Sequence, residues 1–185
     1  MESRPKEATN PKQEAGPAAR FVDYVLKRQA EDNGFSARLR RADNPATEYQ
    51  SWEILASFGV DLEKSWQRLP YCTLGAALAK AKPERDGNLG LGSAIAACYE
   101  DKSQSDQAKS RLRRILACTS IEELCQILRP LLALIASRGV KLNFSLLLQQ
   151  LLWFSGEGQE RVRTRWAQDF YHRKSDESTK EAGNE

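Results

Sequence analysis

The stretch TSIEELCQILRPLLALIASRG, residues 119–139, decides the fold class. Its apolar residues recur every three or four positions, as they do on one face of an α-helix. Thr119-Ser120 followed by Glu122-Glu123 is typical of a capping box at a helix N-terminus. Gly139 suits the position just after a last helical turn. We therefore predict one long apolar helix that Pro130 bends and that stops at Gly139.

The helical period continues towards the C-terminus. Asn143 is expected to cap the apolar run FSLLLQQLLWF that follows it. The last predicted helix, EGQERVRTRWAQDFYHRK, places Val162, Trp166 and Phe170 on one face, because these residues are four positions apart.

The same period continues towards the N-terminus. In FSARLRRA, residues 35–42, Phe35 and Leu39 are expected to face inward. Asn44-Pro45 is interpreted as a helix start, because proline suits the first turn. Asp61 is predicted to open another helix, which Pro70 interrupts or restarts. No segment alternates apolar and polar residues as a strand does, so we predict an all-α, compact bundle of about eight or nine helices.

The two ends of the chain lack periodic apolar positions. Residues 1–18 and the acidic segment 175–185 are predicted to be disordered tails. Residues 19–174 are expected to form a single all-helical domain. That domain could consist of two packed lobes, about 19–82 and 89–174, joined by the polar loop PERDGN.

Cysteine usage and hydropathy indicate a cytoplasmic location. The four cysteines form no CxxC pair and lie among apolar residues, so we expect buried thiols in a reducing compartment. No run approaches the ~18 apolar residues of a membrane span. The start of the chain lacks the apolar core of a signal peptide. No membrane partner is expected.

The residues that catalysis requires are not assembled by the sequence. The single histidine, His172, lies at the end of the last predicted helix, with no acid or nucleophile placed beside it. There is no phosphate-binding loop of the GxxxxGK[ST] type and no cluster of carboxylates for a pair of metals. We therefore predict that the protein is not an enzyme and uses no cofactor or metal.

The charge of the central region favours an anionic partner. Residues 20–174 contain 24 basic and 18 acidic residues, a net charge of +6, and 16 of the basic residues are arginines against 8 lysines. A guanidinium group can bind two phosphate oxygens at once, whereas lysine acts as a point charge.

The arginines form three clusters, RLRR at 38–41, RLRR at 111–114 and RVRTR at 161–165. Each cluster borders an apolar helical stripe, which suggests rigid cations that bind a phosphate backbone without reading bases. Few acids lie one turn away. Asp169 is expected to pair with Arg165, and Asp43 with an arginine of the first cluster. The alternative interpretation is a solvated surface with ordinary ion pairs.

Four tryptophans are candidates for stacking on bases, Trp52, Trp66, Trp153 and Trp166. Each falls on an apolar helical face, so a place in the core is favoured. No helix-turn-helix pattern and no zinc finger stands out. Any binding of nucleic acid is therefore expected to depend on its backbone and shape.

The order of six segments resembles the CasB family, the small subunit of Cascade in type I-E CRISPR systems. The segments are DNGFSARLRRA, LGSAIA, RLRRIL, EELCQILRPLL, LLLQQLLWF and RVRTRWAQDFY, and the similarity covers about residues 20–172. Two departures are Pro130, where relatives often have a basic or apolar residue, and the weakly basic turn at residues 156–159.

The resemblance implies a non-catalytic, all-helical subunit present in two copies within Cascade. It implies partners that include crRNA, the target and displaced non-target DNA strands, a second copy of the chain, and the large and backbone subunits. Nucleic-acid contacts carried over by position fall on Arg40, Arg41, Arg111, Arg114, Arg129, Arg161, Arg163 and Arg165.

Two alternatives remain at this point. One is a helical scaffold or adaptor whose basic surface binds acidic protein partners. The other is a free-standing RNA-binding regulator.

Overall fold

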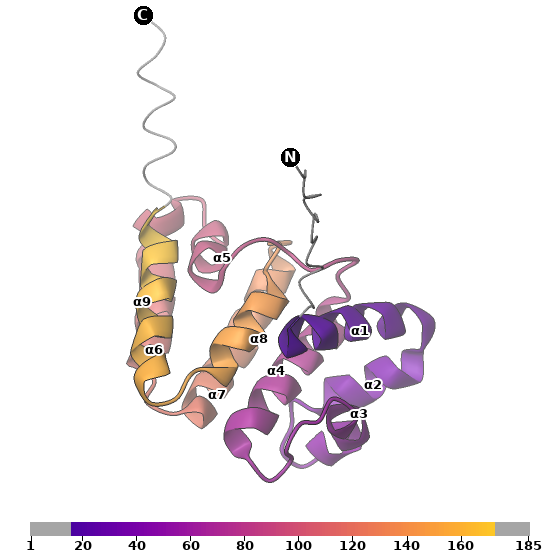
Figure 1. Ribbon diagram of the computed structural model, residues 1–185. Coiled ribbons are helices and arrows are strands. Elements are labelled where there is room, and N and C mark those ends of the chain that lie inside the picture. Colours follow the sequence, from indigo (N-terminus) through magenta and orange to yellow (C-terminus); the bar gives the residue numbers. More distant parts are fainter. Residues whose placement is uncertain (1–15, 173–185) are drawn as a thin grey trace, which may run out of the picture.

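The computed structural model describes residues 16–172, which form nine α-helices and two short 3₁₀ helices (Figure 1). This confirms the all-α prediction. The predicted tails lie outside the described residues except at 16–18. There the prediction was wrong, because α1 begins at Pro17 and Ala18 is buried. The elements are α1 (Pro17–Glu31), α2 (Asn33–Arg41), η1 (Glu48–Ser51), α3 (Trp52–Ser57), α4 (Ser65–Ala81), α5 (Leu91–Ala97), η2 (Lys102–Gln104), α6 (Asp106–Ala117), α7 (Ile121–Ser137), α8 (Phe144–Leu152) and α9 (Glu157–Tyr171).

Helices α4, α7 and α8 form the middle of the molecule. In Figure 1, α1, α2 and α3 lie on one side of them, and α6 and α9 on the other. Helix α4 packs against α7, α8 and the first three helices, whereas α5 packs against α9 and α6. The buried apolar side chains form one hydrophobic cluster that runs through both groups. The arginine-bearing helices α2, α6 and α9 are therefore fixed to one common core.

Helix α7 begins as its sequence predicts. The Ser120 side chain accepts a hydrogen bond from the Glu123 backbone N–H at 3.2 Å, and the Glu123 carboxylate accepts one from the Thr119 N–H at 3.1 Å. Helix α7 then continues through Pro130 to Ser137, and Gly139 follows with a φ of +66°, the left-handed conformation that glycine adopts easily. Likewise, Asn143 caps α8 by accepting a hydrogen bond from Leu146 N–H at 2.8 Å.

Helix α4 corrects two predictions. It runs without interruption through Pro70, and it begins at Ser65 rather than at Asp61. Pro70 lies in the second turn and lacks the N–H that would bond to the carbonyl of Trp66. Burial of the residues that follow, such as Leu74 and Leu78, outweighs that loss. Asp61 instead forms a turn, in which its carboxylate accepts a hydrogen bond from the Glu63 N–H at 3.1 Å.

The segment after α2 also differs from prediction. Asn44-Pro45 does not start a helix, since η1 begins at Glu48 and α3 at Trp52. The Asn44 side chain accepts a hydrogen bond from Ala46 N–H at 2.9 Å. That local bond stabilises a turn in place of the first helical turn.

Helices α5 and α9 approach each other closely at Gly92. A Cβ atom at this position would overlap the backbone oxygen of Trp166 and lie 2.6 Å from the backbone nitrogen of Phe170. Trp166 and Phe170 are buried, as the spacing on α9 predicts. Gly92 therefore lets α5 hold α9, the helix that carries the third arginine cluster, against the core.

The four cysteines are buried and free, as predicted. Burial raises the pKa of the Cys72 thiol to about 12 and that of Cys125 to about 11. The core prediction for the tryptophans holds only for Trp166. Trp52, Trp66 and Trp153 are 37%, 45% and 56% exposed, so for these three it was wrong.

Across residues 16–172, no helix is both long and apolar enough to span a bilayer. The same part of the chain contains no group of His, Cys, Asp and Glu side chains arranged to hold a metal ion.

Candidate nucleic-acid interface

The first arginine cluster lies at the C-terminal end of α2, which is oriented by its N-cap. Asp32 caps α2 by accepting a hydrogen bond from the Phe35 N–H at 2.9 Å, and this bond holds the pKa of the carboxyl below its usual value. Phe35 and Leu39 are buried as predicted. The arginines around Leu39 consequently lie at the border of the core.

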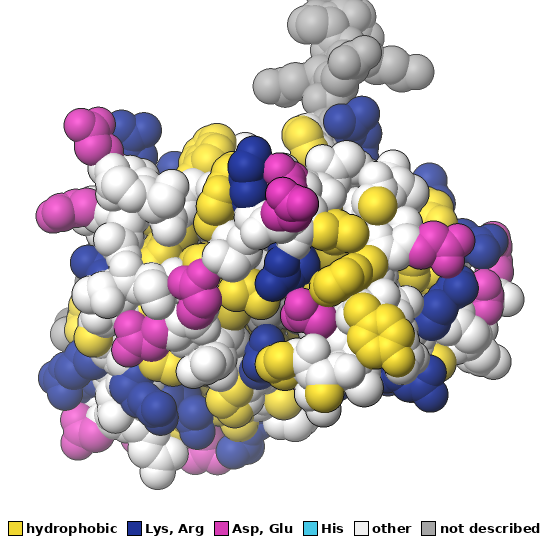
Figure 2. Space-filling view, turned by 90° about the horizontal axis from the view of Figure 1, so that it is seen from below, with side chains coloured by type: hydrophobic (Ala, Val, Ile, Leu, Met, Phe, Trp, Pro, Cys, Tyr) yellow, Lys and Arg dark blue, Asp and Glu magenta, His cyan; other side chains and the backbone are white. Residues whose placement is uncertain are grey.

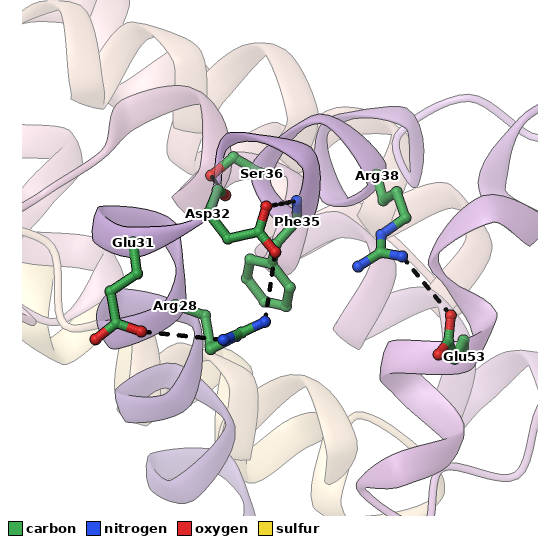
Figure 3. Close-up of polar contacts among 7 residues, drawn as sticks. All are labelled: Arg28, Glu31, Asp32, Phe35, Ser36, Arg38 and Glu53. Atoms are coloured by element: carbon green, nitrogen blue, oxygen red, sulfur yellow. Dashed lines mark hydrogen bonds and ion pairs between the residues drawn. The ribbon is translucent and has the colours of Figure 1, made fainter.

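Two members of this cluster have partners on neighbouring elements. Arg38 pairs with Glu53 of α3 at 3.7 Å (Figure 3), and Arg41 donates a hydrogen bond of 2.7 Å to Gln50. Arg40 is exposed and makes no side-chain ion pair or hydrogen bond within residues 16–172. The cluster therefore does not act as one uniform patch of cations.

Asp43 neutralises two cations from other helices. Its carboxylate lies 3.0 Å from Nε of Arg129 on α7, and it also pairs with Lys80 of α4. The prediction that Asp43 pairs with an arginine of the first cluster was wrong, because the fold brings Arg129 and Lys80 to it. Arg129, a predicted nucleic-acid contact, thus lies in an ion pair with only about a fifth of its side chain exposed.

The second cluster lies on α6. Ser105 caps this helix through the Ala108 N–H at 3.3 Å. Arg111 is half-buried and donates a hydrogen bond of 2.6 Å from Nε to the Tyr99 hydroxyl, a neutral acceptor. Arg113 and Arg114 are exposed, and neither has an ion-pair partner in the described part of the chain.

The third cluster lies on α9 beside the end of α6. Arg163 donates a hydrogen bond to the Cys118 carbonyl, and its guanidinium lies 5.7 Å from the centre of the Phe154 ring. Gln159 bonds to the same carbonyl at 3.2 Å. Arg161 and Arg165 are exposed and have no ion-pair partner among residues 16–172.

The predicted pair between Arg165 and Asp169 is not formed. Asp169 instead accepts hydrogen bonds from the Ser93 N–H at 3.0 Å and from the Ser93 hydroxyl at 2.7 Å. Because the Asp169 carboxylate is bonded to Ser93 near the start of α5, it does not pair with Arg165, four residues before it in the sequence.

The fold thus brings the second and third clusters together and leaves the first on the far side of the molecule. The contacts of Arg163 and Gln159 join the N-terminal half of α9 to the C-terminal end of α6. Figure 2 views this end of the molecule, and Lys and Arg side chains gather on the side where Figure 1 places α6 and α9. We call Arg111, Arg113, Arg114, Arg161, Arg163 and Arg165 the α6–α9 region.

The opposite side has a different electrostatic character. We call Arg38, Arg40, Arg41, Lys80 and Arg129, with Glu53 and Asp43, the α2–α7 region. Acids pair with three of its five cations, whereas the cations of the α6–α9 region have either neutral partners or none within residues 16–172. A phosphate oxygen therefore meets less competition in the α6–α9 region.

Sequence reasoning omitted two kinds of residue from the candidate contacts. Arg113 lies in the second RLRR and is exposed, as Arg114 is. Lys80 lines a pocket between α4 and α7, and Lys82, Arg85 and Lys141 line a neighbouring groove. They are isolated in the sequence, so no local pattern could have found them.

A protein-family model and several solved structures are similar to this chain. The family model described as CRISPR-associated protein Cse2 matches residues 36–171. The crystal structure of CasB from M. ruber matches with a TM-score of 0.70 and 28% identity, covering 90% of this chain and 98% of that one.

Two further structures share the fold at lower identity. CasB from Thermobifida fusca matches with a TM-score of 0.64 and 22% identity over 85% of this chain and 99% of that chain. A chain of a CRISPR RNA-guided surveillance complex matches with a TM-score of 0.68 and 22% identity over 90% and 96%. The comparison with curated proteins finds no significant match.

Proposed function

This chain belongs to the CRISPR-associated Cse2 family, and we propose that it is a non-catalytic subunit of an RNA-guided surveillance complex of the Cascade type. In that complex it stabilises bound nucleic acid without sequence preference. The observation that carries the proposal is the α6–α9 region, where two adjoining helices present Arg113, Arg114, Arg161 and Arg165 without acidic partners in the described chain.

The proposed mechanism is electrostatic. Rigid arginines at the edge of a packed core bind successive phosphates of a strand, and condensed counterions are released. Opening of a target duplex by a guide RNA is a near-balanced exchange of one duplex for another. Even a few contacts to the displaced strand therefore shift the exchange towards the open state.

The predicted contacts separate into three groups under this proposal. Arg114, Arg161 and Arg165, joined by Arg113, contact phosphate directly. Arg111 and Arg163 orient the two helices through the Tyr99 hydroxyl and the Cys118 carbonyl. The remaining predicted contacts, Arg40, Arg41 and Arg129, belong to the opposite side and contact a different part of the path. The partners are the guide RNA, both DNA strands, a second copy of the chain and the neighbouring subunits.

The test removes three cations that have no structural partner. The triple variant Arg114→Ala, Arg161→Ala and Arg165→Ala is compared with wild type for affinity to single-stranded DNA across a salt series. Each lost phosphate contact should lower the slope of log K against log salt by roughly 0.7, so the slope should fall by about 2. In the assembled complex, the open target duplex should dissociate faster.

A control removes unpaired cations elsewhere. The double variant Arg20→Ala and Lys27→Ala changes two exposed cations of α1 that have no ion-pair partner within residues 16–172. It should retain nearly the wild-type salt slope. An equal loss per removed charge in both variants would show that overall charge alone is responsible and would contradict the assigned interface.

Exposed tryptophans favour a second candidate, the helical scaffold. Trp66 and Trp153 are among the large apolar side chains left in solvent. A scaffold would depend on such apolar contacts with partner proteins. Trp66→Ala with Trp153→Ala should then abolish co-purification with other subunits, while the arginine variant leaves assembly and nucleic-acid binding intact.

A further inference from the structure

A pocket of about 220 Å³ lies between α4 and α7, at the edge of the α2–α7 region. Small side chains on the two facing helices leave this space. Its apolar wall consists of Ala77 and Ala81 from α4 and of Leu132, Ala133 and Ala136 from α7. Drug-sized ligands occupy pockets of roughly 300–1,000 Å³, so this one suits a group the size of a single base or side chain.

Polar side chains lie at one end of the same pocket. Thr73 lines it and is 1% exposed, and its hydroxyl faces the Cys125 thiol, where it partly offsets the burial that raises the pKa of that thiol. Asp43 and Arg129 also line the pocket and form an ion pair at 3.0 Å, with about a fifth of each side chain exposed. The exposed atoms of this pair offer an acceptor and donors to a ligand with polar edges.

The mouth of the pocket is basic overall. Lys80 and Arg129 share the single carboxylate of Asp43, which leaves a net charge of +1. Ala81 and Ala136 also line a neighbouring groove of about 980 Å³, where Lys82, Arg85 and Lys141 lie with Glu84 and Asp86. The Asp86 carboxylate accepts hydrogen bonds from the Phe144 and Ser145 N–H groups. Arg40 and Arg41 lie on the other side, two or three residues before Asp43. A polyanionic strand that follows these cations passes over the mouth.

We propose that the pocket takes one unstacked nucleobase of a bound single strand. The inference rests on the proposed function, because it requires a strand at this surface. The flat face of the base packs against the alanines and Leu132, while its polar edge meets the exposed atoms of the ion pair of Asp43 and Arg129. Lys80, whose side chain is half-exposed, contacts the adjoining phosphate. The α2–α7 region therefore binds a base, whereas the α6–α9 region binds phosphates.

A base fits these observations better than a phosphate alone. A phosphate has no apolar face to cover five aliphatic side chains, and Asp43 would repel it. A base carries both donors and acceptors on its edge, so it can bond to a carboxylate and to a guanidinium. Insertion of one base leaves the neighbouring bases unread, in agreement with binding that has little sequence preference.

The experiment compares two strands that differ only in their bases. The full chain is titrated with a labelled 20-nucleotide DNA strand of mixed sequence and with a strand of equal length made of abasic residues. Wild type should bind the normal strand about tenfold more tightly, which corresponds to roughly 1.4 kcal/mol. Ala133→Leu fills the pocket from an exposed helical position, so it should bind both strands with the wild-type abasic affinity.

Ala56→Leu is the matched control, because Ala56 is exposed on α3 and does not line the pocket. It should keep the tenfold preference. If Ala133→Leu lowers the melting temperature, Ala136→Leu is a second variant that fills the same pocket. Equal wild-type affinity for both strands would overturn base insertion but leave the proposed function standing.

Two other outcomes also decide the question. Failure of wild type to bind either strand would overturn the proposed function and base insertion together. If Ala133→Leu leaves both DNA affinities unchanged yet prevents assembly with other subunits, the occupant is an acidic side chain of a partner protein, and base insertion is overturned.

Discussion

The α6–α9 region and the α2–α7 region contain similar arginine sequences but use them differently. Both include the tetrapeptide RLRR on a short amphipathic helix. In the α2 copy Arg38 pairs with Glu53 and Arg41 bonds to the neutral Gln50, while nearby Asp43 pairs with Arg129 and Lys80 of other helices. In the α6 copy Arg111 bonds to the Tyr99 hydroxyl, and Arg113 and Arg114 have no ion-pair partner within residues 16–172. Identical local sequences therefore differ in the charge that they offer to a ligand.

The difference shows that an arginine cluster is evidence of nucleic-acid binding only after its partners are known. When a phosphate approaches an ion-paired arginine, either the pair must break or the acid continues to neutralise the guanidinium charge. A guanidinium bound to a neutral acceptor keeps its full charge. Variants that add or remove charged partners, or that loosen the supporting helices, test this comparison.

Gly92→Ala should disrupt the support of the α6–α9 region. The added Cβ overlaps the backbone of α9 and cannot be relieved by a side-chain movement, so we expect a loss of about 3 kcal/mol in the free energy of unfolding. Denaturant unfolding measures this loss, and affinity for single-stranded DNA should fall with it. Gly16→Ala is the control, because a Cβ there meets nothing within 4 Å. Wild-type stability of Gly92→Ala would contradict the close approach of α5 and α9.

Asp43→Ala should make the α2–α7 region resemble the α6–α9 region. Removal of the shared carboxylate leaves Arg129 and Lys80 unneutralised and partly buried, which should cost about 1–2 kcal/mol of stability. Affinity for an abasic strand, which reports backbone charge alone, should rise by about fivefold for one added phosphate contact at 0.1 M salt. Unchanged affinity would mean that these cations do not lie on the path of a strand.

Asp32→Ala should loosen α2 without touching its arginines. The cap to the Phe35 N–H is lost, and the melting temperature should fall by about 3 °C. The Phe35 N–H lowers the pKa of Asp32 from 3.8, so the capping contribution is complete above that value and disappears as the pH falls through the folded pKa. The difference between variant and wild type should therefore be constant at neutral pH and shrink below about pH 4. A difference that persists in acid would contradict capping by the carboxylate.

Ser110→Glu should give the α6–α9 region the acid that it lacks. The new carboxylate lies one turn before Arg114 on the exposed surface of α6, where an i, i+4 pair forms readily. We expect about fivefold weaker binding of single-stranded DNA at 0.1 M salt, the loss of one phosphate contact. Ser110→Gln is the isosteric control and should bind as wild type does. Equal weakening by both variants would point to a steric effect.

Much of the secondary structure is predictable because its signals are local. The capping box of Ser120 and Glu123, the cap by Asn143 and the stripe of Val162, Trp166 and Phe170 are all confirmed. Pro70 misleads because the burial of the residues after it stabilises α4 more than one missing hydrogen bond destabilises it. The possible division into two lobes stays a prediction, although α4 and α7, from opposite sides of the proposed boundary, pack directly against each other.

Local sequence patterns are enough to predict the helical class, the inward faces of most helices and the position of each arginine cluster at the border of an apolar stripe. These follow from periods of three and four residues and from capping, which act within a few positions along the chain. Which arginines remain without an acid depends on tertiary packing. Asp43 and Arg129 are 86 positions apart, and Ser93 and Asp169 are 76 positions apart. Such pairs depend on how helices pack, and packing is a property of the whole core.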